Sequence, residues 1–101
     1  MGEEKGAMGY FERTLALSDE VGDASLSALT RGNIANLVLI SGNTEKALSL
    51  FTESLVAFER LGDRQSSVFS LLGFADVYAS LSDLSRAEEY ARRALEISVG
   101  V

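Results

Sequence analysis

The sequence contains no cysteine, no histidine, no proline and no tryptophan. Without cysteine and histidine the chain cannot form disulfides, thiol nucleophiles or imidazole bases, and it lacks the usual ligands of zinc. We therefore expect no metal site and no cofactor. The absence of proline, together with a hydrophobic content of 47%, favours a folded and largely helical chain over a disordered one. The absence of cysteine also fits a reducing compartment, so we expect a cytoplasmic protein.

Positive charge is scarce as well. The 9 Lys and Arg residues are outnumbered by 15 Asp and Glu residues, the formal net charge is -6 at pH 7, and no basic cluster exists. Binding to nucleic acid or to an anionic membrane surface is disfavoured, because both require a positively charged footprint. No run of about 18 apolar residues is present, so no segment is predicted to span a membrane. The charged segment 1–5 leads directly into a helical pattern and does not resemble a secretory signal.

The chain does contain a repeat with a period of 40 residues, since the segment 47–55 recurs as 7–15 and as 87–95. Four kinds of residue coincide in the three copies: alanine (Ala7, Ala47, Ala87), a bulky residue (Tyr10, Leu50, Tyr90), a small residue (Thr14, Ser54, Ala94) and leucine (Leu15, Leu55, Leu95). A fixed period of this length is typical of a solenoid, in which each unit buries its apolar face against its neighbours. The spacing places these residues near one stripe of a helix, so the leucines are predicted to lie in the core.

The hydrophobic pattern predicts an all-α chain of five helices, over about residues 3–19, 24–41, 44–60, 64–81 and 84–98. The apolar run 34–40 could form a strand, but its length, its flanks and the repeat favour a buried helix. Four short turns separate the helices: Gly22-Asp23, Gly42-Asn43, Gly62-Asp63 and Ser82-Asp83. Glycine can adopt the left-handed conformation that ends a helix, and Asp or Asn can cap the next one. The cap of the third helix is either Asn43 or Thr44.

Several residues of this pattern resemble the tetratricopeptide repeat in its 40-residue form. The first helix of each pair carries Ile34, Ala35 and Val38, and then Phe74, Ala75 and Tyr78; the second carries Ala47, Phe51, Ser54 and Leu55, and then Ala87, Tyr90, Ala94 and Leu95. The resemblance implies one domain over residues 1–101, a right-handed superhelical solenoid of antiparallel helix pairs. Its parts are a half repeat (1–22) and two repeats (23–62 and 63–101). The departures are Arg31 in place of a large apolar residue, Ala91 in place of an aromatic one, and the missing proline.

The resemblance also implies a function, because such repeats are protein-interaction modules whose inner, concave face is lined by the first helix of each pair. By matching positions, that face would bind a peptide or helix of a partner protein through Leu29, Gly32, Asn33, Asn36, Ile40, Phe69, Leu72, Gly73, Asp76 and Ser80. Asn33 and Asn36 suit the backbone of an extended peptide because an amide both donates and accepts hydrogen bonds. The alternative is that the two amides are solvated or bond within the solenoid.

Two other classes of function remain in view. Paired acids such as Glu88 and Glu89, or Asp19 and Glu20, do not face each other on a helix, and no phosphate-binding loop is present, so an enzyme is not expected. The chain could instead be a structural, self-associating segment of a larger scaffold or regulatory protein. We expect a homodimer or larger assembly, because apolar residues are predicted to be uncovered on the inner face and at both ends. At the far end these are Tyr90, Leu95 and Ile97.

Overall fold

The structure is a computed structural model that describes the backbone of residues 2–100 and the side chains of residues 6–100. It contains five α-helices: α1 (Gly2–Val21), α2 (Ala24–Ile40), α3 (Thr44–Arg60), α4 (Arg64–Ser80) and α5 (Leu84–Ser98). No strand occurs among the described residues. The predicted all-α class is confirmed, and the helix ends lie within about two residues of those expected, as sequence patterns allow.

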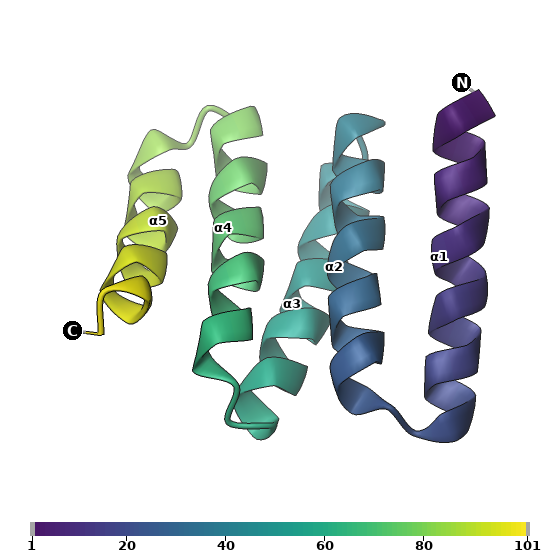
Figure 1. Ribbon diagram of the computed structural model, residues 1–101. Coiled ribbons are helices and arrows are strands. Elements are labelled where there is room, and N and C mark those ends of the chain that lie inside the picture. Colours follow the sequence, from purple (N-terminus) through teal and green to yellow (C-terminus); the bar gives the residue numbers. More distant parts are fainter. Residues whose placement is uncertain (1, 101) are drawn as a thin grey trace.

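The helices form two layers, and consecutive helices run antiparallel (Figure 1). The most extensive contacts join α2 to α3 and α4 to α5. Helix α2 also packs directly on α4, whereas within the described residues α1 does not approach α3 and α3 does not approach α5. Because α2 and α4 approach each other and the other three helices do not, α2 and α4 form the inner layer of the solenoid. Helices α1, α3 and α5 form the outer layer.

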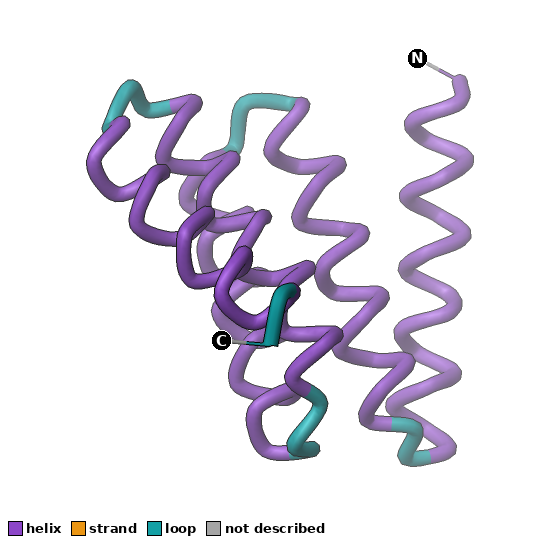
Figure 2. Tube along the Cα trace, turned by 60° about the vertical axis from the view of Figure 1, so that its left-hand side comes forward, coloured by secondary structure: helices purple, strands orange, loops and turns teal. Residues whose placement is uncertain are grey.

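All four turns share one backbone pattern, visible as short loops in Figure 2. One residue in each turn, directly before the cap of the next helix, has a positive φ: 75° at Gly22, 92° at Gly42, 68° at Gly62 and 61° at Ser82. A capping side chain follows, and its oxygen accepts a hydrogen bond from a backbone N–H in the first turn of the next helix. The caps are Asp23, Asn43, Asp63 and Asp83, with donor–acceptor distances of 3.0, 3.1, 3.0 and 3.2 Å. Asn43, and not Thr44, therefore caps α3.

The core lies between the two layers. Its main cluster consists of Ile34, Ala35, Val38, Ala47, Phe51, Phe74 and Val77. The three leucines predicted to lie in the core differ in burial. Leu15 and Leu55 are half-buried against this cluster, and Leu95 is exposed. The prediction is therefore wrong for Leu95. In α1 and α3 this column is covered by the inner helix that follows, and no described helix covers the equivalent side of α5.

Candidate functional site

One stripe of α2 faces away from the core on the inner layer and carries four of the predicted binding residues. Leu29, Asn33, Asn36 and Ile40 follow one another at helical spacing. The two apolar side chains at the ends of the stripe are exposed, and the two asparagines are half-buried. Neither asparagine side chain forms a hydrogen bond with another described residue. Both amides are thus free to donate to and accept from a ligand.

Helix α4 contributes the adjacent part of the inner layer. Leu72, Asp76 and Ser80 are exposed, and Phe69 is half-buried. The Ser80 hydroxyl donates a 2.6 Å hydrogen bond to the carbonyl oxygen of Val77 in its own helix. The inner layer therefore combines exposed apolar side chains, one carboxylate and the two free amides.

The other two predicted site residues, Gly32 and Gly73, are buried and act in helix packing. A Cβ atom at Gly32 would lie 2.3 Å from Cε2 of Phe69, and one at Gly73 would lie 2.3 Å from Cε1 of Phe51. Each glycine thus leaves room for an aromatic ring from a neighbouring helix. Gly32 allows α4 to approach α2, and Gly73 allows α3 to approach α4.

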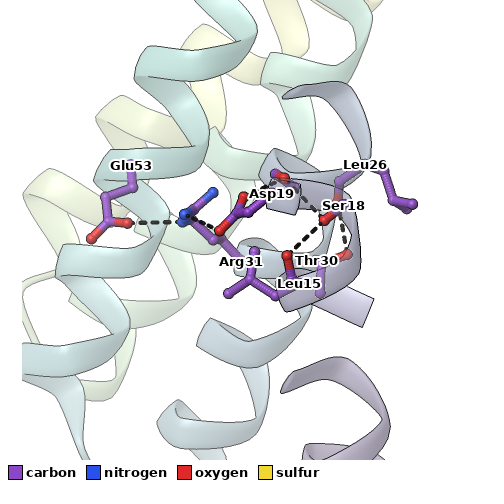
Figure 3. A network of polar contacts seen from close by, with 8 residues as sticks. Leu15, Ser18, Asp19, Leu26, Thr30, Arg31 and Glu53 are labelled. Carbon is purple, nitrogen blue, oxygen red and sulfur yellow. Dashed lines mark hydrogen bonds and ion pairs between the residues drawn. The ribbon is translucent and has the colours of Figure 1, made fainter. Parts of the chain in front are cut away.

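The sequence analysis marked Arg31 as a departure from the repeat pattern without assigning it a partner. Its guanidinium forms ion pairs with Asp19 of α1, at 3.3 Å, and with Glu53 of α3, at 3.0 Å (Figure 3). The arginine on α2 therefore links three consecutive helices. Both carboxylates are about half-exposed, and pairs of this kind stabilise a fold by roughly 0–1 kcal/mol each. The residue types alone carry no signal for this pairing, because it requires the relative positions of three helices.

Two buried hydroxyls extend this polar cluster at the contact between α1 and α2. The Ser27 hydroxyl lies 2.6 Å from Oδ1 of Asp19 and 2.9 Å from Oγ of Ser18, which in turn lies 3.0 Å from the carbonyl oxygen of Leu15. Each serine has one hydrogen to donate, so the two hydroxyls fill two of these three contacts at a time. The cluster satisfies polar groups at the contact between α1 and α2.

An aromatic stack fills the contact between α4 and α5. The Tyr90 ring lies between those of Phe74 and Tyr78, with centroid distances of 5.0 and 5.6 Å. The guanidiniums of Arg86 and Arg93 lie over Tyr78 and Tyr90 at 5.4 and 5.3 Å. Tyr90 was expected to be uncovered at the end of the solenoid, and that expectation is wrong, because its ring is directed toward α4.

The main depressions on the surface of the described residues are open to solvent. Three open depressions have volumes of about 190, 260 and 310 Å³. None of them includes a predicted binding residue, and Arg31 lines two of them. Within the described part of the chain, no three acidic residues gather in a way that could hold a metal ion. No described helix is long and apolar enough to cross a membrane.

Comparison with known proteins identifies the family. A family model described as the tetratricopeptide repeat matches residues 26–98, which cover the segment from α2 to α5. A search of curated proteins finds no significant match. Family and fold agree, since the matched segment contains the two helix pairs α2–α3 and α4–α5. The chain therefore belongs to the tetratricopeptide repeat family.

Proposed function

We propose that this chain is a non-catalytic protein-interaction module whose inner layer binds an extended peptide segment of a partner protein. Members of its family generally mediate protein–protein interactions. The observation that carries the proposal is the pair of asparagine side chains on α2, Asn33 and Asn36, which are half-buried and have no hydrogen-bond partner among the described residues. Their amide atoms are open to solvent, since no buried side-chain nitrogen or oxygen of the described residues lacks a partner. A peptide backbone supplies both a donor and an acceptor for such an amide.

The surroundings of the two amides support an extended ligand. Leu29 and Ile40 are exposed on either side of them along α2, and Leu72 is exposed on the neighbouring α4. These apolar groups would bury side chains of the ligand while the amides bond to its main chain. The exposed carboxylate of Asp76 favours a basic residue in the peptide, in line with the net charge of -6.

The test is to select peptides from a displayed random library against the wild-type protein and to titrate one of them into variants. Asn36→Ala should weaken binding by about 1–3 kcal/mol, the cost of leaving a buried polar group unpaired, with little change in the melting temperature. Ser49→Ala, an exposed position on the outer helix α3, is the control and should bind as the wild type does. Equal affinity for Asn36→Ala, or loss of binding in the control, would reject the inner-layer site.

A second candidate function is self-association as a structural segment, with the same inner layer covered by another copy of the chain. It is favoured by the exposed apolar side chains of Leu29, Ile40 and Leu72. Contiguous apolar patches of more than a few hundred Å² commonly mark interfaces. In this case a two-fold dimer would bury the inner layer instead of leaving it open to a peptide.

A further inference from the structure

Helix α1 carries an apolar face that no other described helix covers. Tyr10, Leu17 and Val21 lie along one stripe of α1 and are 60%, 62% and 76% exposed. Helix α1 contacts only α2 in the described structure, and Figure 1 shows it as the last helix of the row. The uncovered face is thus turned away from the rest of the solenoid.

The internal repeat shows what this face can bind. Forty residues later, Leu50 occupies the position of Tyr10 and is half-buried on α3, which packs against α2; Tyr90 does the same on α5, with its ring stacked on Phe74 of α4. In both complete pairs, therefore, an inner helix covers the position of Tyr10. The position of Leu17 is half-buried in both pairs, whereas Leu61, at the position of Val21, stays exposed. The open stripe has the residue pattern of a surface that receives a helix.

Helix α2 supplies the second wall of this site. Leu29 of α2 is exposed, and its counterpart forty residues later is Phe69, whose ring lies over Gly32 of the preceding inner helix. By the same geometry, Leu29 would lie over a small residue of a helix placed beside α2. By repeat position, the surface formed by α1 and Leu29, called the groove below, corresponds to the surface of α3 and α4 against which α2 packs.

A charge adds specificity to this groove. Arg13 of α1 occupies the repeat position of Glu53, which pairs with Arg31 across the α2–α3 contact at 3.0 Å. Arg13 forms no ion pair with another described residue. A helix docked on α1 in the same way would present the position of Arg31 to Arg13, where an acidic side chain would be attracted and a basic one repelled.

We propose that the groove formed by α1 and Leu29 binds an amphipathic helix of another polypeptide, with the residue pattern of α2 and an acidic residue at the position of Arg31. A second copy of this chain is not the expected occupant. The two helices with this pattern, α2 and α4, each pack against three others within their own solenoid. The proposed site shares Leu29 with the inner-layer site and otherwise lies on α1. The substitutions that test it, at Leu17 and Arg13, lie outside the inner layer, so the two proposals can fail separately.

The test uses a synthetic peptide with the sequence of residues 23–40, which retains the capping Asp23, and with the substitution Arg31→Glu. Fluorescence anisotropy should give saturable binding to the wild-type protein with a Kd of roughly 1–100 µM, as for weak specific contacts. The protein variant Leu17→Glu should weaken this binding at least about tenfold, because it places a charge in the groove. Leu95→Glu is the matched control: Leu95 is 61% exposed at the other end of the solenoid, and its substitution should leave the Kd unchanged.

A charge exchange separates specific docking from general attraction. The peptide with Arg31→Glu should bind the wild-type protein about two- to fivefold more tightly than the unmodified peptide, a ratio in keeping with a partly exposed ion pair. In the protein variant Arg13→Glu this order should reverse. General attraction to a chain of net charge -6 predicts that the unmodified, more basic peptide binds better in both cases.

Three results would overturn the proposal. The first is the absence of saturable binding of either peptide at about 300 µM protein, well above the dissociation constants expected here. The second is binding that Leu17→Glu does not weaken, which would mean that the peptide occupies another surface. The third is a wild-type dimer that Leu17→Glu dissociates, which would make a second copy the occupant of the groove. Circular dichroism of the variants confirms in each case that they are folded.

Discussion

The substitution Gly73→Ala tests whether the two buried glycines serve packing or ligand binding. The methyl group would lie 2.3 Å from Cε1 of Phe51 and 2.5 Å from both Cδ1 and Cζ. Phe51 is completely buried in the main core cluster. To reach an ordinary contact distance, the ring must retreat by about 1 Å into a core packed as densely as a crystal.

The expected magnitude follows from two opposing effects. Alanine is a better helix former than glycine by about 1 kcal/mol, which favours the variant. Overpacking of a well-filled core costs about 1–3 kcal/mol, and a ring with no route to solvent corresponds to the upper end of this range. The net loss of stability should therefore be about 2 kcal/mol. For a domain of this size that lowers the melting temperature by roughly 8–16 °C.

Gly32→Ala provides the comparison within the same chain. Its methyl group would meet the Phe69 ring at 2.3 Å, but Phe69 is only half-buried and can rotate toward solvent. The helix-forming gain then offsets most of the cost, and stability should change by less than about 1 kcal/mol. Urea denaturation followed by circular dichroism measures both variants. A midpoint for Gly73→Ala equal to or above that of the wild type would refute the packing argument.

Three further predictions follow from the turns and the inner layer. Ser82→Gly should stabilise the fold by about 1 kcal/mol, because a side chain at positive φ is strained. Gly62→Ser should lower the free energy of unfolding by a similar amount. A urea midpoint equal to that of the wild type would contradict the prediction for either variant. The Ser66 hydroxyl and backbone N–H lower the pKa of Asp63 below its ordinary value of 3.8. The charged carboxylate thus stabilises the fold above that pH and ceases to do so as the pH falls through its folded-state pKa. The stability difference between wild type and Asp63→Asn should be present at pH 6 and decrease as the pH falls below 3.8; a difference independent of pH would exclude this role. The second candidate function predicts that light scattering at about 100 µM protein detects a dimer or larger assembly, which Leu72→Glu should dissociate; a monomeric wild type would rule out that candidate and leave the inner layer open to a peptide.

The helices and their turns could be predicted from the sequence because their causes are local. A glycine, or Ser82, at positive φ followed by a capping Asp or Asn determines where one helix ends and the next begins. The 40-residue period then identifies which helices form pairs. These signals depend on residues within a few positions of one another, so no knowledge of the tertiary arrangement is needed.

The roles of individual side chains across helix contacts were less predictable. Arg31 bonds to residues 12 positions before it and 22 positions after it, and that pairing exists only once three helices are packed. Gly32 and Gly73 match the repeat positions of inner-face residues, yet each lies beneath an aromatic ring. Whether such a position faces a ligand or a neighbouring helix depends on the size of the residue across the contact, which a periodic pattern does not specify. Asn33 and Asn36 do lie on the inner layer, and their role there stays a prediction.

The row-like arrangement of the helices has a consequence for the cooperativity of unfolding. Among the described residues, helix α1 contacts only α2, and α5 contacts only α4, whereas α2 and α4 each have three neighbours. In such an array the free energy of opening rises from the ends toward the middle, so amide hydrogens of α1 and α5 should exchange with solvent before those of α2–α4. A helix bound to the outer side of α1 would move the end of the array by one element. Slower exchange in α1 would then report occupancy of that groove without any change in the average structure.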